Sequence, residues 1–506
     1  MFVIDCDTCF GTQSSGAPDV AAGDLIKWER SNGVAYGLAC SVKSRAFDAR
    51  IGNDEALRAA REHPGILPVA SVDPREHCRF EAEIARMAEL GFAAVRVFPE
   101  LQQWPVDSLL FSRVVNACAQ HCMPLMVSAN APGRASEVVR LAHHTTSPII
   151  LLGVSYNTLS EALAAAAARP NTYVCTQLFV TPGSIDIAAE AIGADRLVLG
   201  SGCPEYSVRP AINMVMASEL SEDDKANVLG GNLARIIKPQ IRKLGETLTD
   251  SGFEKFEERR LRGPKIDVHG HIGPWPFPMT DCWAADLEKM MRKSGIERAI
   301  ISSTEAIVND FVAGNAAMAR EMDKTDMLLG YVTVSPSRLE QSVDEMDRYL
   351  AQPKFVGVKL HPSYAGVSID SEPVIRLSAE VAKRRVPFLI HTWGHGEPSK
   401  ILKLANEFPE MPIIMGHGGA TAWRESIDVL KKTHNTYTEF CASLSHRDKV
   451  RETIDAVGYD RVLFGTDLGL FDPAYVLGTY EEAALTNDEE AAIMRDNARR
   501  LFSLDR

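Results

Sequence analysis

A long internal repeat constrains the fold of this 506-residue chain more than any other feature of its sequence. The phrase IDCDTCFG at residues 4–11 returns as IDVHGHIG at residues 266–273, an offset of 262. Near the other end of the repeat, DRLVLG (195–200) returns as DRVLFG (460–465), an offset of 265. Because chance matches would scatter in offset, this slow drift indicates a tandem duplication.

Each copy alternates short strand-like segments with amphipathic helical segments. Strict alternation of strand and helix predicts a parallel sheet with helices outside it. Eight such units in about 240 residues have the size of a (β/α)8 barrel. A doubly wound open sheet is the alternative, but neither HGHIGP nor CFGTQSSGAP resembles the glycine-rich phosphate loop that usually follows its first strand. We therefore predict an α/β protein of two tandem (β/α)8 TIM-like barrels. The strand-like segments of the second copy are KIDVHGH, IERAIISST, LLGYVTVSP, VGVKLHP, PFLIHTW, PIIMGHG, TYTEFCA and RVLFGTD.

The stretch between the two copies has a different composition. RKLGETLTDSGFEKFEERRLRGP (242–264) is dense in charged residues and lacks the strand–helix rhythm, as is typical of a solvated linker. The predicted organisation is a first barrel at 1–240, a charged linker at 241–263 and a second barrel at 264–506.

Charge and composition bound the partners and the compartment. The formal net charge of −13 at pH 7 disfavours a nucleic-acid partner, because phosphate contacts need an excess of Lys and Arg. No segment reaches the roughly 18 uninterrupted apolar residues of a membrane span, and the start MFVIDCD is strand-like rather than a signal peptide. The ten cysteines fit reduced thiols. We therefore expect a cytoplasmic protein that acts on a small molecule, with neither nucleic acid nor membrane as a partner.

Four histidines and one aspartate of the second copy fall at the ends of its predicted strands. His269 and His271 end the first strand and project from the same face, because side chains alternate along a strand. His391 ends the fifth strand, His417 the sixth and Asp467 the eighth. Barrel enzymes place their chemistry at this C-terminal face. Burying these groups together without a cation would be unfavourable, so the set predicts a site for a divalent metal such as zinc.

The same residues carry a resemblance to a known family. H-x-H after the first strand, K-L-H-P at the fourth, L-I-H-T at the fifth, G-H-G-G at the sixth and F-G-T-D at the eighth resemble the amidohydrolase superfamily. More narrowly, they resemble its amidohydrolase-2 branch, which includes aminocarboxymuconate-semialdehyde decarboxylase, resorcylate-type decarboxylases and several lactone and amide hydrolases. The resemblance spans residues 264–506.

The resemblance implies a role for each residue. His269, His271, His391 and Asp467 would bind one divalent ion, with zinc expected first and manganese or iron as alternatives. Asp467 would also take the proton from water on the metal, whose pKa a metal lowers to about 7. His417 would hydrogen-bond that water or polarise the substrate. Asp467 and His417 are thus the candidate catalytic residues.

A second set of side chains is predicted to contact the substrate. Lys359 shares a strand face with His361. It would carry a carbamate bridging two metals, offer a cation to a substrate carboxylate, or fill a polar layer of the barrel by pairing with Asp or Glu. We favour a one-metal site in which Lys359 contacts the substrate or supports the ligands. Trp275, Trp393 and Trp423 are predicted to lie in loops at the barrel mouth, where an aromatic lining would suit a planar substrate. The candidate substrate contacts are Lys359, His361, His395, Glu439, Trp275 and Trp393.

The first copy lacks the metal-binding set. At the aligned positions it carries, in chain order, Asp7, Cys9, Ser128, Gly153 and Gly202 in place of the four histidines and the aspartate, while Arg96 and Phe98 replace Lys359 and His361. We therefore predict that the first barrel is a degenerate, non-catalytic copy, which pairs with the second as an intramolecular pseudo-dimer and leaves room for further homo-oligomerisation.

Three functions remain open from the sequence. The first is a metal-dependent hydrolase of a small amide, imide, lactone or ester. The second is a metal-dependent non-oxidative decarboxylase or hydratase of an aromatic or muconate-like acid, because the ligand set suits both reactions. The third is a non-catalytic binding or scaffold protein, which the intact spacing of the second copy disfavours.

Overall fold

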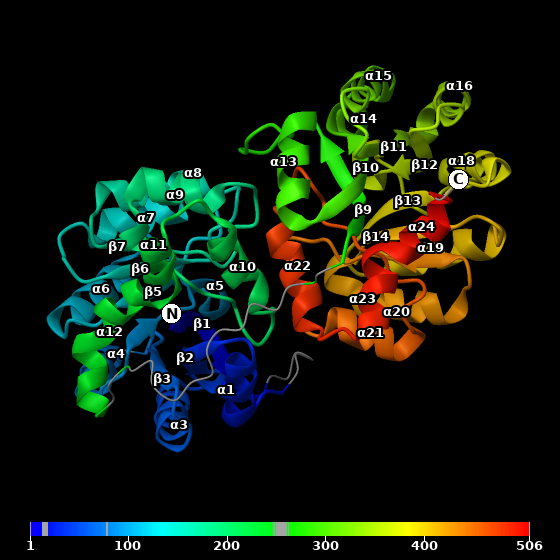
Figure 1. The fold of residues 1–506 in the computed structure, drawn as a ribbon. Coiled ribbons are helices and arrows are strands. Elements are labelled where there is room, and N and C mark those ends of the chain that lie inside the picture. Colours follow the sequence, from blue (N-terminus) through cyan, green and yellow to red (C-terminus); the bar gives the residue numbers. More distant parts are fainter. Residues whose placement is uncertain are drawn as a thin grey trace. The chain divides into compact units, whose positions relative to one another are not determined.

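The chain forms two compact units, Met1–Arg259 and Arg260–Arg506, each with its own sheet (Figure 1). The computed structural model describes residues 2–12, 19–76, 79–245, 248, 261 and 263–504. Most of the predicted linker therefore lies outside the described residues. At its start, Arg242–Leu244 continues helix α12 (Asn232–Ile241) as a single 3-10 turn. No helix of the described ranges has both the length and the apolar character that crossing a membrane requires.

The first unit is a barrel of eight parallel strands that follow one another in chain order. Backbone hydrogen bonds from Cys6 N to Leu199 O (2.9 Å) and from Cys9 N to Cys203 O (3.0 Å) join the first strand to the segment after the last. The strands are β1 (Val3–Phe10), β2 (Val34–Ser41), β3 (Ile66–Ser71), β4 (Ala94–Arg96), β5 (Leu125–Ser128), β6 (Ile149–Leu152), β7 (Thr172–Cys175) and β8 (Leu197–Val198).

The second unit carries seven regular parallel strands, again in chain order. They are β9 (Lys265–Ile272), β10 (Ile296–Ser303), β11 (Leu328–Thr333), β12 (Phe355–Leu360), β13 (Phe388–Trp393), β14 (Ile413–Gly419) and β15 (Thr436–Thr438). The two tandem (β/α)8 barrels predicted from the sequence are confirmed as the fold class.

The prediction of a regular eighth strand in the second unit, RVLFGTD (461–467), is wrong in one respect. The segment lies in the eighth position, since Leu463 N donates to Thr438 O (2.8 Å) and Val268 N donates to Phe464 O (2.9 Å), but it makes only isolated bridges to its neighbours. The segment ends at Asp467, whose positive φ of 60° lies outside the region of a β-strand.

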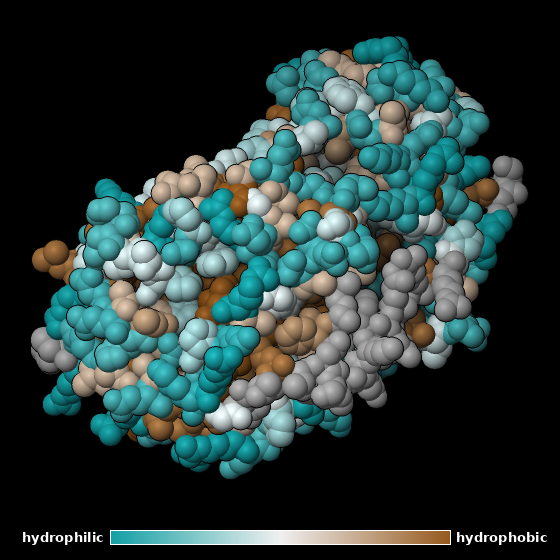
Figure 2. All heavy atoms as spheres, turned by 60° about the vertical axis from the view of Figure 1, so that its left-hand side comes forward, coloured by the Kyte–Doolittle hydropathy of each residue, from teal (hydrophilic) through white to brown (hydrophobic). Residues whose placement is uncertain are grey.

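Helices surround each sheet and bury one face against it. Helix α3, for example, buries Ala56, Leu57 and Ala60, the one-sided spacing of an amphipathic helix. Hydrophilic residues predominate on the face drawn in Figure 2. The helices of the first unit are α1 (Ala22–Ser31), α2 (Val42–Ala46), α3 (Ala49–Glu62), α4 (Phe80–Leu90), α5 (Pro99–Gln102), α6 (Leu109–Gln120), α7 (Arg134–Ala142), α8 (Leu159–Ala168), α9 (Ser184–Ile192), α10 (Arg209–Ala217), α11 (Glu222–Ala226) and α12. Those of the second are α13 (Ala284–Ser294), α14 (Thr304–Val308), α15 (Phe311–Met322), α16 (Leu339–Leu350), α17 (Pro362–Ala365), α18 (Glu372–Arg384), α19 (Glu397–Glu407), α20 (Trp423–Lys432), α21 (Lys449–Val457), α22 (Pro473–Glu482), α23 (Asn487–Ala491) and α24 (Asn497–Phe502).

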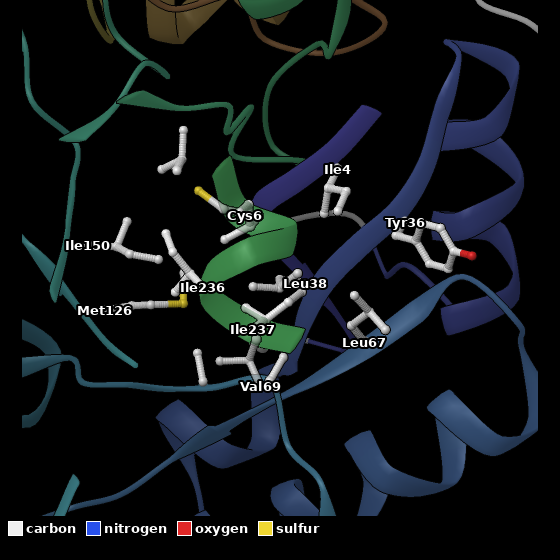
Figure 3. Close-up of a cluster of buried hydrophobic side chains, with 14 of the residues drawn as sticks. Ile4, Cys6, Tyr36, Leu38, Leu67, Val69, Met126, Ile150, Ile236 and Ile237 are labelled. Atoms are coloured by element: carbon white, nitrogen blue, oxygen red, sulfur yellow. The ribbon is translucent and has the colours of Figure 1, made fainter. Parts of the chain in front are cut away.

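A C-terminal helix contributes to the hydrophobic core of each barrel. In the first unit, Ile236 and Ile237 of α12 pack in one cluster with strand residues such as Leu38 and Met126 (Figure 3). In the second unit, Phe502 of α24 packs with the strand residues of the corresponding cluster. Burial of large apolar side chains is the main favourable term for folding, so each unit carries its own source of stability.

The duplication extends to side-chain hydrogen bonds. Asn232 donates through Nδ2 to two backbone carbonyls at 2.8 Å each, and Asn497 does the same at 2.7 and 2.8 Å. Each of these asparagines follows a π-helical segment, Asn227–Gly231 or Ala492–Asp496. Buried amide groups need such partners, so the two copies share the same internal contacts as well as the same topology.

We expect a fragment of residues 260–506 to fold by itself, because its strands and its hydrophobic cluster belong to one unit. The measurement is a thermal or urea unfolding curve followed by circular dichroism. A single cooperative transition confirms the expectation, whereas an insoluble or non-cooperative fragment would show that the second barrel depends on the first as a scaffold.

Candidate metal centre

Three of the predicted ligands meet at the C-terminal end of the second barrel. His271 Nε2 lies 2.7 Å from Asp467 Oδ1, and His269 Nε2 lies 3.9 Å from the same oxygen. The ligand atoms of these three residues all lie within 4.8 Å of one another, and all three side chains are buried. Strand β9 supplies both histidines, and the irregular eighth segment supplies the aspartate.

Asp467 provides the test of whether this set suits a cation. Its Oδ1 is buried and makes no hydrogen bond within the described part of the chain, because the approach of His271 lacks hydrogen-bond geometry. Burial by itself would raise the pKa of Asp467, but the adjacent imidazoles, His271 first, hold it well below its usual range. An ionised, buried oxygen without a donor is costly, and a divalent ion would satisfy it. The donor set therefore fits a metal.

Two bonded neighbours determine which nitrogen of His269 faces the centre. Nδ1 donates to Glu439 Oε1 at 2.8 Å, which leaves the lone pair of a neutral ring on Nε2. In this structure Lys359 Nζ lies 2.7 Å from that nitrogen and donates to it. Because one lone pair cannot serve both, a metal on His269 requires the ammonium group to give up this bond.

His271 has a partner that suits metal binding equally well. Ser302 Oγ, at the end of β10, lies 3.1 Å from His271 Nδ1. A hydroxyl group can donate or accept, so it satisfies either tautomer of the ring. With Nδ1–H donating to Ser302, Nε2 is left free to ligate.

His391 and His417 form a separate hydrogen-bonded pair. His417 Nδ1 donates to the carbonyl of Cys441 at 2.8 Å, so its Nε2 accepts, and the donor at 2.9 Å is His391 Nδ1. This chain of bonds leaves Nε2 as the unprotonated nitrogen of His391. The ring atoms of His391 lie outside the cluster formed by His269, His271 and Asp467, so its place in the ligand set remains a prediction.

Burial disfavours the charged form of three imidazoles of the site, those of His269, His271 and His391. It lowers the pKa of His271 and lowers the pKa values of His269 and His391 well below 6.5. A histidine must be neutral to bind a metal, so these rings need lose no proton when they ligate.

A second group of possible ligand atoms surrounds the other nitrogen of His269. It comprises His269, His417, Glu439 and Cys441. Its atoms already have orienting roles, because Glu439 also accepts from His417 N (2.6 Å) and Cys441 N (2.7 Å). Burial raises the pKa of the Cys441 thiol well above 9, which makes it a poor ligand. The group is a supporting layer that fixes the orientation of His269 and His417.

The predicted substrate contacts separate into three kinds of environment. Lys359 is fully buried beside His269, and burial lowers its pKa to about 8. Glu439 is also fully buried, with both oxygens engaged, so its position supports orientation of His269 rather than contact with a substrate. His395 lies at the surface, with its side chain 81% exposed, and bonds to Glu425 (2.9 Å).

The remaining candidates line the barrel mouth. The ring of His361 stacks on that of His391 at a centroid distance of 3.8 Å, and the ring of Trp393 lies nearly parallel to that of His391 at 6.1 Å. Trp275 lies in a loop with its ring 4.9 Å from that of His271. The predicted loop position of Trp393 is wrong, because this residue ends β13 and continues its extended backbone.

A pocket of about 390 Å³ opens beside His391 and Trp393. Sites for small molecules typically measure roughly 300–1,000 Å³, so the volume suits a small substrate. Its remaining lining comes from α17, from the loop after α17 and from α19, and includes Ser363, Ser368 and Lys400.

Sequence reasoning missed the residues that orient the ligands. Ser302 and the Cys441 carbonyl were not identified, although each lies at or just beyond a strand end, beside a predicted ligand on the neighbouring strand. A polar residue at the C-terminal end of a strand next to a ligand-bearing strand is the signal that was available for Ser302.

Two residues of the site occupy backbone conformations that normally favour glycine. His417 has a φ of 67° and Asp467 a φ of 60°, and such conformations in functional residues cost on the order of 1–3 kcal/mol each. The aligned residues of the first barrel are glycines in the same conformation, Gly153 at 67° and Gly202 at 79°. The backbone at the site is thus the same in both barrels, and only the second carries side chains there.

A family comparison bears directly on this centre. The family model described as Amidohydrolase (Amidohydro_2) matches residues 23–238 and again residues 266–504, together most of the chain. The chain belongs to the amidohydrolase family. The amidohydrolase family is metal-dependent, and the buried histidine and carboxylate cluster of the second barrel suits that chemistry. The two matched regions correspond to the two barrels, as expected for a tandem amidohydrolase.

Solved structures resemble about half of this amidohydrolase chain. A 2,6-dihydroxybenzoate decarboxylase from Rhizobium is 19% identical with a TM-score of 0.42, over 48% of this chain and 99% of that chain. A dihydroxybenzoic acid decarboxylase from Polaromonas, solved with bound manganese, is 18% identical with a TM-score of 0.41, over 48% and 98%. A probable 2-pyrone-4,6-dicarboxylic acid hydrolase from Acinetobacter baumannii is 13% identical with a TM-score of 0.38, over 48% and 100%. Likenesses at this level leave the reaction of this chain open. No curated protein matches it.

Replacement of Asp467 by glycine and by alanine should separate backbone strain from side-chain chemistry. Both variants remove the carboxylate, but only glycine adopts a φ of 60° without strain. We expect the free energy of unfolding of Asp467→Gly to be about 1 kcal/mol higher than that of Asp467→Ala. The measurement is urea denaturation of the metal-free protein. Equal stability of the two variants would show that the backbone at residue 467 is not strained.

Replacement of Glu439 by glutamine should weaken metal binding. The amide presents a donor where the carboxylate accepts, which disturbs the orientation of His269. We expect a metal affinity about 10–100-fold lower, measured by competition with a chelator. Glu425→Gln is the matched control, because Glu425 bonds an exposed histidine at the surface; equal losses in the two variants would contradict the orienting role.

Proposed function

We propose that the second barrel is a metal-dependent hydrolase of a small amide, imide, lactone or ester. The observation that carries the proposal is the unpaired carboxylate oxygen of Asp467 between the Nε2 atoms of His271 and His269. When bound, a divalent ion, zinc in the first instance, supplies a Lewis acid that polarises a carbonyl and makes water acidic enough to ionise near neutral pH.

Asp467 is the residue suited to proton transfer. Its depressed pKa keeps it ionised at neutral pH, so it can accept a proton from the attacking water and later return that proton to the leaving group. Buried neighbours hold it in place and exclude bulk water. His417 Nε2 accepts a hydrogen bond from His391 Nδ1, and a substrate oxygen could accept that bond in place of His417.

The pocket beside the centre is proposed to hold the rest of the substrate. Trp393 offers a flat apolar surface, and the hydroxyl groups of Ser363 and Ser368 offer polar contacts. Aromatic faces with a few polar groups typically select small, partly planar molecules. The proposed partner is therefore a small molecule.

Non-oxidative decarboxylation is the second candidate, and one observation favours it. Lys359 Nζ is fully buried and has a histidine nitrogen, rather than a carboxylate, as its hydrogen-bond partner. A buried ammonium group recognises a substrate carboxylate well, and a decarboxylase requires such a substrate. A carboxylated ester or lactone would make the same contact, so product analysis decides between the two.

Removal of the metal should abolish turnover, and the products should identify the reaction. Protein stripped with a chelator and reloaded with Zn²⁺, Mn²⁺ or Fe²⁺ would be screened against lactones, esters, amides and aromatic carboxylic acids. Hydrolysis is expected to release acid without CO₂, whereas CO₂ release would establish decarboxylation instead. His391→Ala is expected to lose metal and activity together, and His434→Gln, at an exposed histidine, is the control.

A non-catalytic role is the outcome that would overturn both candidates. It would follow if the purified protein held less than about half an equivalent of metal and could not be reloaded, since the donor set fits a divalent ion.

A further inference from the structure

The mouth of the first barrel carries two arginines where the second barrel carries its metal centre. Arg96 ends β4 at the position aligned with Lys359, and Arg45 lies in α2, directly after β2. Their guanidinium carbons lie 4.8 and 5.8 Å from the centroid of the Phe98 ring. Both cations therefore lie over one buried aromatic ring at the C-terminal face, where barrel proteins bind their ligands.

The charges at this mouth do not balance. Asp7 is the carboxylate that pairs with Arg96, through the guanidinium nitrogen Nη1. Arg45 makes no ion pair with any described residue. Arg96, Arg45 and Asp7 together thus carry one excess positive charge.

Arg96 also has an unused edge. Its side chain is 14% exposed, and its Nε is buried without a hydrogen-bond partner in the described structure. A guanidinium group presents Nε and Nη2 as a fork that matches the two oxygens of a carboxylate. Leaving a buried donor without an acceptor is unfavourable, so an acceptor is expected at this edge.

The chain uses this same edge elsewhere to hold carboxylates. Arg86 bonds the two oxygens of Glu83 through Nε (2.9 Å) and Nη2 (2.7 Å). Arg424 bonds Glu452 through the same two atoms, at 3.2 and 2.9 Å. The edge that is engaged in these two arginines is the one that Arg96 leaves open.

We propose that the mouth of the first barrel binds a small carboxylate, held by the Nε–Nη2 edge of Arg96 with Arg45 as the second cation. A monoanion balances the single excess positive charge, whereas a phosphate dianion would exceed it and be repelled by Asp7. Ser128 and Gly153 stand in place of two imidazoles, so this end of the barrel carries smaller side chains. The first barrel is then a ligand-binding module, independent of the reaction at the second.

The test uses the full-length protein, with benzoate and inorganic phosphate as probes. Isothermal titration measures affinity, and hydrogen–deuterium exchange locates the protected peptides. The variants are Arg96→Lys, which keeps a cation beside Asp7 but removes the fork, and Arg45→Gln. Arg424→Lys is the matched control, because it loses the same two-oxygen fork at a surface pair.

Benzoate is expected to bind and to protect peptides covering residues 36–48 and 94–103. Arg96→Lys should weaken binding about tenfold or more, because lysine cannot pair with two oxygens in parallel. Arg45→Gln should weaken it about threefold through the lost charge, which keeps the test valid if Arg96→Lys fails to fold. The control should bind as the wild type does.

Three results would overturn the proposal. The first is protection confined to peptides of the second barrel, such as 265–273 and 388–393. The second is equal affinity in the wild type and both binding-site variants. The third is tighter binding of phosphate than of benzoate, which would exclude a carboxylate as the ligand.

Discussion

The buried carboxylate of Asp267 holds together the two segments from which the metal centre is built. It accepts hydrogen bonds from His269 N (3.0 Å), from Thr466 N (3.0 Å) and from Thr466 Oγ1 (2.5 Å). The end of β9 and the irregular eighth segment are thereby joined one residue away from Asp467. Backbone hydrogen bonds from Leu468 N to His269 O (3.2 Å) and from His271 N to Leu468 O (2.7 Å) join the same two segments on the other side of Asp467. Asp5 bonds Asp7 N, Ser201 N and the Ser201 hydroxyl in the same way in the first barrel.

Because this hydrogen-bonded aspartate is present in both barrels, it belongs to the fold. The chemistry of each barrel depends on the side chains that lie next to it. In the second barrel the chain continues into His269, His271 and Asp467, with Asp467 held at a positive φ. In the first barrel the same backbone carries Asp7, and a glycine removes the strain. A strained side chain persists only where its surroundings over-determine it, and functional sites are where such strain is commonly found.

On the proposed assignments, the two barrels differ in the positive group that stabilises a buried carboxylate. Each has a carboxylate buried at the same end of the sheet, and an ionised buried carboxylate needs a positive partner. Asp467 has neutral imidazoles around it and suits a metal ion as that partner. Asp7 has Arg96, whose guanidinium group can bind a second carboxylate at its remaining edge.

The fold and the choice of ligand residues followed from local patterns. The repeat, the alternation of strands and helices, and the placement of His269, His271 and Asp467 at strand ends depend on residues close in sequence, and parallel strands bring those ends to one face. The orientation of the histidine rings could not be predicted from local patterns, because it depends on partners far apart in the chain. Glu439 is 170 residues from His269, and Lys359 is 90 residues from it. The same holds for the Arg96–Asp7 pair, 89 residues apart. Hydrogen-bond geometry changes over fractions of an ångström, and packing across the barrel, rather than periodicity along the chain, sets distances on that scale.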